Sequence, residues 1–208
     1  MRRYRGCVVK LGGSLGGSPW LASWLSVLAH PTASCTVVPG GGRFADAVRT
    51  AQAEWNITDD AAHAMALLAM AQYGLALQSR APGLALARGL AALEQGDHTA
   101  PRLWLPILAD QHALDADGLP RDWSLSSDSI ALWLANRLQA DALVLVKPLD
   151  GKSTLDCTPE QIREFSAQGV LDAFFPGLTP ACPVHIMAAG EGPGDLAILD
   201  SSLTWHGR

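Results

Sequence analysis

Cysteine is scarce in this 208-residue sequence, and the four cysteines stand far apart. None forms a CxxC pair, and no histidine follows at the spacing of a zinc site. The pattern argues against a zinc centre and a disulfide framework, and we expect reduced, partly buried thiols in a cytoplasmic protein. The four are Cys7, Cys35, Cys157 and Cys182.

Charged residues and long apolar stretches are also few. Charged side chains make up 17% of the residues and the net charge is -5, so the clustered basic side chains that face nucleic-acid phosphates are missing. No apolar stretch reaches the roughly 20 residues of a membrane-spanning helix. The basic start, residues 1–5, is followed by Lys10 and a glycine loop rather than by a signal-peptide core. We therefore expect a small-molecule substrate, with neither nucleic acid nor membrane as a partner.

Hydrophobic residues, by contrast, are plentiful at 49%, and 208 residues fit a single α/β domain over 1–208. Short apolar runs at 7–11 and 35–38 predict buried strands. Apolar residues at helical spacing follow each run, at 20–28 and 44–54. This alternation predicts a three-layer αβα sandwich around an open, mostly parallel sheet.

The segment 59–78 predicts a long helix that is apolar nearly all round. Such a helix is either central or covered by another subunit, so we expect a homo-oligomer, a dimer or larger. The polar segment 115–121 is typical of a loop, and 147–151 of a turn. The remaining expected strands are 84–87, 103–105, 142–146 and 183–187, and the remaining helices are 89–95, one capped by residues 126–128, and 193–199.

Two glycine loops follow expected strands. Gly12-Gly13 and Gly40-Gly41-Gly42 each stand between a strand and a helix, where unobstructed backbone N–H groups can face phosphate oxygens. Open parallel sheets bind ligands at the carboxyl ends of their strands, and Lys10 would reach the same crevice. Each loop alone is equally typical of a tight turn, and Lys10 alone of a strand-end lysine extending to solvent.

Two familiar phosphate motifs are absent. Gly151-Lys152-Ser153 resembles the end of a P-loop, but the spacing GxxxxGK[ST] requires glycine at Val146. The loop after the first strand lacks the GxGxxG fingerprint, so the sequence does not indicate a dinucleotide site.

Four ordered segments instead resemble the signatures of the amino acid kinase family, whose members include acetylglutamate, carbamate, aspartate and uridylate kinases. The resemblance covers about residues 5–155 and implies an αβα sandwich that uses ATP and Mg²⁺. The segments are Val9-Lys10-Leu11-Gly12-Gly13-Ser14, Val38-Pro39-Gly40-Gly41-Gly42, Ser127-Asp128-Ser129-Ile130-Ala131 and Leu149-Asp150-Gly151.

The resemblance also implies roles for these residues. Lys10 would contact the γ-phosphoryl group and Asp128 would orient that lysine, although Asp128 could instead be an exposed residue of a first helical turn. Asp150 and Gly151 would border the nucleotide, or form an ordinary turn. The loop residues expected to hold phosphoryl and acceptor groups are Gly12, Gly13, Ser14, Gly40, Gly41, Gly42 and Ser127.

A second lysine is less clear, because the C-terminal region lacks one at the place that many family members provide it. Lys147 and Lys152 are the candidates for ATP contact, or else solvated lysines beside a turn.

The acceptor side resembles two branches of the family. The segment 62–70 resembles the acceptor helix of uridylate kinases, with His63 in place of an aspartate that contacts ribose. The wider pattern looks most like the small kinases of methanofuran biosynthesis, which phosphorylate [5-(aminomethyl)furan-3-yl]methyl phosphate. The pattern consists of Asp59-Asp60-Ala61-Ala62-His63, Trp104-Leu105-Pro106, Trp123 with Ser127-Asp128-Ser129, and Lys147-Pro148-Leu149-Asp150-Gly151. His63 would then donate to a phosphate, and Asp59 or Asp60 would pair with an amine. A packed histidine and two residues stabilising a helix start are the alternatives.

The sequence therefore leaves three hypotheses of function. They are a kinase of a phosphate-bearing acceptor, a carboxylate or nucleotide-monophosphate kinase, and a non-catalytic relative that binds nucleotide or oxyanion.

Overall fold

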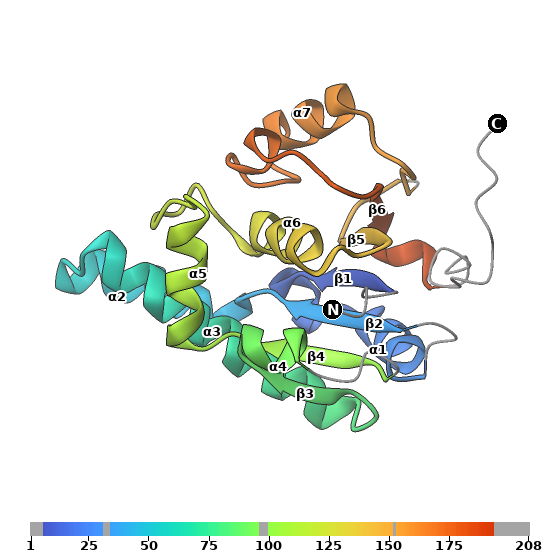
Figure 1. Ribbon diagram of the computed structural model, residues 1–208, viewed down its shortest axis with the longest axis horizontal. Coiled ribbons are helices and arrows are strands. Elements are labelled where there is room, and N and C mark those ends of the chain that lie inside the picture. The colour runs from blue at the N-terminus through green and yellow to red at the C-terminus, as the bar shows by residue number, and fades with distance from the viewer. Residues whose placement is uncertain (1–5, 31–33, 96–99, 152, 194–208) are drawn as a thin grey trace.

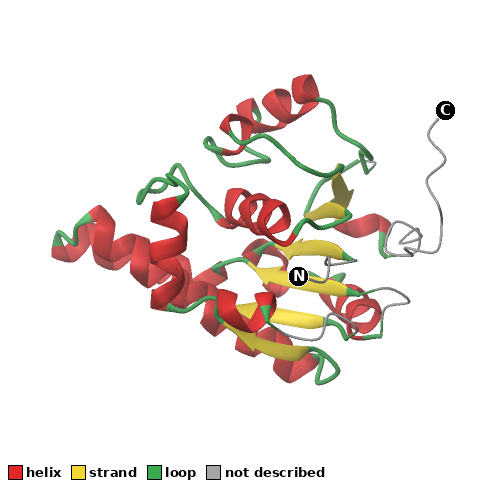
Figure 2. Ribbon diagram, in the orientation of Figure 1, coloured by secondary structure: helices red, strands yellow, loops and turns green. Residues whose placement is uncertain are grey.

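The computed structural model describes residues 6–30, 34–95, 100–151 and 153–193, and within them the strands form one parallel six-stranded sheet. Its order is β3-β4-β2-β1-β5-β6, with helices in front of and behind it (Figure 2). The predicted αβα architecture is confirmed. The strands are β1 (Cys7–Leu11), β2 (Cys35–Pro39), β3 (Ala85–Arg88), β4 (Arg102–Leu105), β5 (Ala142–Lys147) and β6 (Val184–Ala188).

The alternation of side chains along the strands divides the core into two layers, because successive residues point to opposite faces of a sheet. Val8, Leu143 and Leu145 pack on one face with α6, whereas Val9 and Val144 pack on the other with α1. Both faces are covered, as is usual for parallel sheets. The helices are α1 (Leu21–Ala29), α2 (Gly42–Trp55), α3 (Asp59–Arg80), α4 (Leu90–Glu94), α5 (Gln111–Ala116), α6 (Ser127–Leu138) and α7 (Pro159–Ala167).

Helices α2 and α3 pack against each other, and α2 extends away from the sheet (Figure 1). Asn56 ends α2 in the left-handed conformation. Thr58 then caps α3, its side chain accepting from the backbone N–H of Ala61 at 3.4 Å. Asp59 and Asp60 occupy the first turn of α3, where the partial positive charge of a helix start favours carboxylates.

Three parts of the chain differ from the sequence prediction. The predicted loop 115–121 begins inside α5, which follows the short 3₁₀ helix η2 (Leu108–Asp110). Helix α7 was not predicted, although Thr158 and Gln161 form a capping box at its start. Lys147 is the last residue of β5 rather than part of a turn. Apart from Pro193, the helix predicted over 193–199 lies outside the described residues.

Three further 3₁₀ helices complete the path of the chain, namely η1 (Gly13–Gly17), η3 (Phe175–Gly177) and η4 (Ala189–Glu191). Figure 1 shows α7 beyond the β6 edge of the sheet, opposite the β3 edge.

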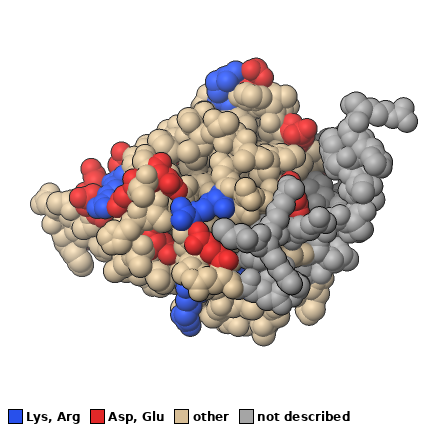
Figure 3. All heavy atoms as spheres, viewed as in Figure 1, with Lys and Arg blue, Asp and Glu red and all other residues tan. Residues whose placement is uncertain are grey.

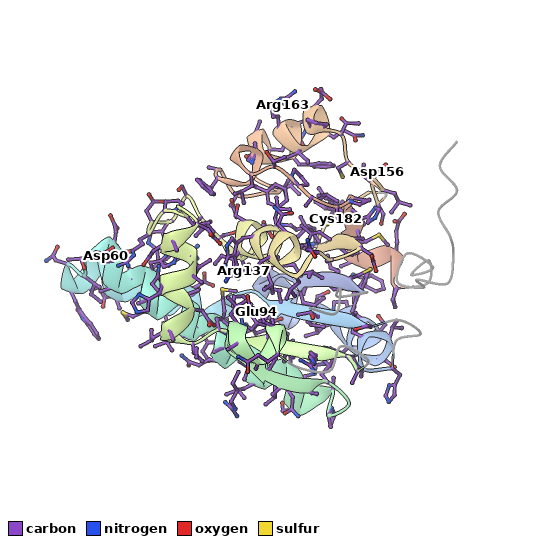
Figure 4. The ribbon with its side chains drawn as sticks, viewed as in Figure 1. Asp60, Glu94, Arg137, Asp156, Arg163 and Cys182 are labelled. Atoms are coloured by element: carbon purple, nitrogen blue, oxygen red, sulfur yellow. The ribbon has the colours of Figure 1, made fainter. Side chains whose placement is uncertain are left out.

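Charged side chains are sparse on the face shown in Figure 3 and gather in small groups of mixed sign. One group joins two helices on the same side of the sheet, where Arg137 of α6 lies beside Glu94 of α4 (Figure 4). Their Nε and Oε1 atoms are 2.8 Å apart. In the described part of the chain, no helix combines the length and apolar character needed to cross a membrane.

Candidate active site

The two glycine loops meet directly. Strands β1 and β2 are neighbours with Leu11 opposite Pro39, so both chains turn at the same sheet edge. A Cβ added at Gly13 would lie 2.1 Å from the backbone nitrogen of Gly42, and one added at Gly40 would lie 2.4 Å from the nitrogen of Gly13. Only glycine allows these backbones to approach so closely.

A buried carboxylate lies between two lysines beside this junction. Lys10 Nζ is 2.7 Å from Asp128 Oδ1, and Lys147 Nζ is 2.5 Å from Asp128 Oδ2. All three residues are buried, with exposed fractions of 5%, 4% and 8% for Lys10, Asp128 and Lys147. The structure thus brings together residues that are 118 and 19 positions from Asp128 in the chain.

Sheet register explains why both lysines reach Asp128. Lys10 on β1 is opposite Leu145 on β5, and Lys147 is two residues further along β5. Residues two apart share a face, so both lysines point to the face covered by α6. Ser126 caps α6 and puts Asp128 in its first turn. The alternative of an exposed Asp128 is therefore wrong, as is that of a solvated Lys147.

The charges of the trio shift one another's protonation. Burial alone would raise the pKa of Asp128, but the adjacent ammonium groups of Lys10 and Lys147 outweigh it, and the net shift is downward. Burial, reinforced by the charge of Lys10, lowers the pKa of Lys147 from its ordinary 10.5 to about 8. Asp128 therefore stays ionised at neutral pH, while Lys147 can lose its proton in mildly alkaline solution.

An open cavity of about 880 Å³ adjoins the glycine junction. Its floor is one stripe of α3, since its lining residues on that helix recur every three or four positions. Gly13, Ser14, Ser126 and Ser127 line its glycine-loop and α6 sides. The stripe consists of Asp59, His63, Ala66, Leu67, Met70, Tyr73 and Ala76.

Two polar atoms of this stripe are buried without a hydrogen-bond partner among the described residues, His63 Nε2 and Tyr73 Oη. Tyr73 lies beneath both loops, because a Cβ at Gly16 would be 3.3 Å from its ring and one at Gly42 would be 3.5 Å from it. Burial raises the pKa of Tyr73 to about 12, so its hydroxyl remains a donor. Burial, with a further contribution from Arg121, lowers the pKa of His63 and keeps its ring neutral. Buried polar atoms normally have a hydrogen-bond partner, and a ligand or a water in the cavity would supply one for these two.

Some predicted site residues lie elsewhere. Asp60 is absent from the cavity lining and pairs with Arg121, its Oδ1 lying 3.4 Å from Nη1. Asp150 and Gly151 are exposed beyond the end of β5 and do not line the cavity. Lys152 lies outside the described residues.

The cavity also contains side chains that the sequence analysis missed. Arg49 stacks on Trp123 with 4.1 Å from its Cζ to the ring centroid, and Trp123 Nε1 donates to Gln52 at 2.5 Å. Gln52 in turn donates to Asp59 at 2.8 Å, which links α2, α3 and the loop before α6. Arg49 carried no motif, whereas Trp123 belonged to the wider pattern of the resemblance but had no role assigned to it. Tyr73 could have been found, because it continues the helical spacing of His63 and Met70.

Lysine usage is a signal that the sequence analysis also overlooked. The chain contains only three lysines, and two of them, Lys10 and Lys147, meet at one carboxylate. In a chain that uses arginine almost everywhere else for positive charge, this points to a task that requires a compact ammonium group.

The fold and the site together define a class, that of a parallel α/β sheet with a glycine-lined crevice and a buried pair of lysines at the carboxyl ends of its strands. No family model matches the chain. Among curated proteins it is similar to the [5-(aminomethyl)furan-3-yl]methyl phosphate kinase of Methanocaldococcus jannaschii, with 24% identity over 147 residues. That match covers 69% of this chain and 66% of the relative, just under two thirds of its length.

Solved structures show the same fold. The uridylate kinase of Archaeoglobus fulgidus superposes with a TM-score of 0.60 at 17% identity, covering 88% of this chain and 90% of that one. The UMP kinase of Bacillus anthracis gives 0.57 at 14% identity, covering 93% and 90%. These proteins are kinases, and the solved structures share with this chain the fold of the amino acid kinase family, whose signature segments the sequence resembles.

Proposed function

We propose that the protein is an ATP-dependent kinase that transfers the γ-phosphoryl group to a small, phosphate-bearing acceptor. The observation that carries the proposal is the trio of Lys10, Asp128 and Lys147 beside two touching glycine loops. Phosphoryl transfer asks chiefly for positioning and for neutralisation of charge on the phosphoryl oxygens. Two ammonium groups fixed by one carboxylate provide that neutralisation.

In the proposed reaction an acceptor oxygen forms a bond to the γ-phosphorus while the bond from that phosphorus to the β–γ bridging oxygen breaks, releasing ADP. A phosphate acceptor is already largely deprotonated at neutral pH, because the second pKa of a phosphate monoester is about 6. No side chain is then required as a general base. This agrees with a trio that contains two cations and a carboxylate committed to them.

ATP and Mg²⁺ fit this arrangement. A Cβ at Gly12 would lie 3.0 Å from Lys10 Nζ, so glycine keeps a side chain from crowding the ammonium group that would face a phosphate. Among the described residues no three His, Cys, Asp or Glu side chains form a metal-binding group. Mg²⁺ that accompanies ATP takes most of its ligands from phosphates and water, and would neutralise developing charge there.

The α3 stripe supports an acceptor with an apolar middle and polar ends. Leu67 and Met70 separate the hydroxyl of Tyr73 from the imidazole of His63. Asp59 borders the cavity near the start of α3, and its carboxylate, which accepts from Gln52 at 2.8 Å, would also pair with an amine there, whereas Asp60 pairs with Arg121. An aminomethyl-furan methyl phosphate has these features, and its use by the Methanocaldococcus jannaschii relative makes it the acceptor we propose. A nucleoside monophosphate is the second candidate, favoured by the structural neighbours.

An acceptor panel tests the proposal. ADP release would be followed with the furan phosphate, UMP and a carboxylate substrate, with hydroxylamine added to trap any acyl phosphate. We expect a new phosphoanhydride on the furan phosphate. Acyl hydroxamate formation would indicate a carboxylate kinase, and ATP binding without ADP release on any acceptor would favour a non-catalytic binding protein.

Activity should fall as the pH rises through about 8. Lys147 is charged below its pKa of about 8 and neutral above it, so the charge that faces phosphate is present only on the acidic side. The measurement is kcat/KM for ATP between pH 6 and 9.5. Lys147→Arg is the control, because a guanidinium keeps its charge and should abolish the alkaline limb. A wild-type profile that stays flat to pH 9.5 would contradict this role.

Tyr73→Phe should raise KM for the acceptor about tenfold while KM for ATP stays within about twofold. A hydrogen bond to a charged group contributes about 1.5–3 kcal/mol, and the variant loses the buried donor beneath the glycine loops. Thermal melting serves as the control. Because the hydroxyl has no partner among the described residues, the melting temperature should not fall. An unchanged acceptor KM would show that the hydroxyl does not bind the acceptor.

The homo-oligomer expected from α3 remains part of the proposal. Leu68 and Leu75 lie two turns apart on α3 and are 40% and 44% exposed, which leaves an apolar strip on the side away from the core. Sedimentation as a monomer at micromolar concentration would contradict it.

A further inference from the structure

The turn between α7 and β6 contacts two elements that carry the trio of Lys10, Asp128 and Lys147, namely β5 and the start of α6. It runs from Val170 to Phe175, and Leu171 and Phe175 anchor it in the core with exposed fractions of 3% and 0%. At one end of the turn, the carbonyl of Val170 accepts from Lys147 Nζ at 2.5 Å. In the middle, Asp172 faces the start of α6.

The carboxylate of Asp172 accepts hydrogen bonds from the first turn of α6. Its Oδ2 accepts from Ser126 N at 3.0 Å, Ser126 Oγ at 2.7 Å and Ser129 N at 3.0 Å. Its Oδ1 accepts from Ser129 Oγ at 2.5 Å and from Phe175 N at 3.0 Å. Ser126 and Ser129 stand on either side of Asp128 in the chain, so the carboxylate of Asp172 binds the helix turn that carries Asp128.

Ser126 connects Asp172 to Asp128 through hydrogen bonds. The hydroxyl that donates to Asp172 also accepts from the backbone nitrogen of Asp128 at 3.3 Å. A negative charge at this helix start is favourable in itself, which would account for a purely stabilising role. The contact between Lys147 and Val170 in the same turn is not explained by capping, since Lys147 belongs to β5.

We propose that Asp172 is a positioning residue for phosphoryl transfer, holding α6 and the Val170 turn so that Asp128 stays between Lys10 and Lys147. The inference rests on the proposed kinase function. Asp172 itself touches neither reacting group in this arrangement. It acts through Ser126 and Ser129 on the carboxylate, and through the turn on the second lysine.

Asp172→Asn should lower kcat about tenfold, because the amide cannot accept all five hydrogen bonds and the start of α6 loosens. KM for ATP should change less than about threefold. The alkaline limb of kcat/KM should also move to lower pH, since the charge of Asp172 helps to keep Lys147 protonated. Asp172→Glu, which keeps the charge, should restore the limb more fully than it restores kcat.

Asp110→Asn is the matched control. Asp110 is also a buried aspartate that accepts from backbone nitrogens, those of Leu90 at 2.8 Å and Ile107 at 3.0 Å, but within the described residues its hydrogen bonds reach neither α6 nor Lys10 and Lys147. The Asp110→Asn variant should lose thermal stability, whereas the alkaline limb of its kcat/KM profile should not shift. If Asp172→Asn behaves in the same way, with kcat and the limb unchanged, Asp172 is a structural cap and the inference is overturned.

A titration that needs no substrate separates this inference from the kinase proposal. The ¹³Cε signal of Lys147, assigned with Lys147→Arg, would be followed against pH in the wild type and in Asp172→Asn. A downward shift in the variant shows that Asp172 acts on Lys147 even if no acceptor is phosphorylated, in which case the kinase proposal alone fails. Should Asp172→Asn not fold, Ser129→Ala removes one of the same contacts, and we expect a twofold to fivefold loss of kcat. Wild-type kcat in that variant would overturn the inference.

Discussion

Replacing Lys10 with methionine is expected to lower kcat about a thousandfold. Lys10 is at the carboxyl end of the central strand β1, beside Gly12 and within 2.7 Å of Asp128. Removing one preorganised group that stabilises developing charge typically costs a factor of about 10² to 10³, and cations placed on a transferring phosphoryl group reach about 10³ to 10⁵. Methionine keeps the length of the side chain, so the effect isolates the charge.

Coupled ADP release and single-turnover transfer would measure this loss. The fold should survive, because Asp128 keeps Lys147 as a partner when Lys10 is gone. Arg163→Met is the control, since it removes a cation that is exposed on α7 and that, among the residues the structure describes, forms an ion pair only with Glu160. Turnover within tenfold of wild type in Lys10→Met would remove Lys10 from the reaction and overturn the proposed function.

Asp128→Asn is expected to damage both stability and turnover. The variant leaves two buried ammonium groups without their carboxylate, and removing one partner of a buried ion pair costs about 3–5 kcal/mol of unfolding free energy. We also expect kcat to fall by at least a hundredfold, because neither lysine remains fixed in place. Urea unfolding and ADP release measure the two effects.

The pH dependence of that variant provides a sharper check. Lys147 already has a folded-state pKa of about 8 against an ordinary 10.5, so the unfolded chain binds more protons between these values and stability rises with pH in that window. Without Asp128 the folded-state pKa falls further, and the window extends to lower pH. The stability deficit of Asp128→Asn should therefore shrink between pH 7 and 9. A deficit that does not change with pH would contradict the proposed charge balance.

Sequence patterns predicted the sheet because each strand is a short apolar run that ends at a turn signal. The runs at 7–11 and 35–38 match β1 and β2 to within one residue. Helix α7 escaped prediction because Glu160, Arg163 and Glu164 make it largely polar, so its capping box was its main signal. Helix α5 was missed because it is short and lies beside residues typical of loops.

The residues of the candidate site likewise divide into those that the sequence predicts and those that it does not. Lys10 and Gly12-Gly13 are adjacent in the chain, so the motif alone brought them together, and Gly40 to Gly42 follow the next strand. Lys147 required knowledge of strand register, because only the pairing of β1 with β5 shows that it points to the same face as Lys10. Asp172 and Trp123 meet their partners across loops whose paths no local pattern determines.

The glycine junction has a consequence for how this site can vary between proteins. The backbones at Gly13 and Gly40 leave no room for a Cβ unless the facing loop moves, and Gly42 has a φ of 54°, in the left-handed region that favours glycine. A substitution tolerated at one position would therefore need a compensating displacement at another, and single steps would pass through a protein with a damaged crevice. The three glycines should therefore be retained or replaced together in evolution. Changes of acceptor specificity would arise instead from the α3 stripe, where side chains can change one at a time.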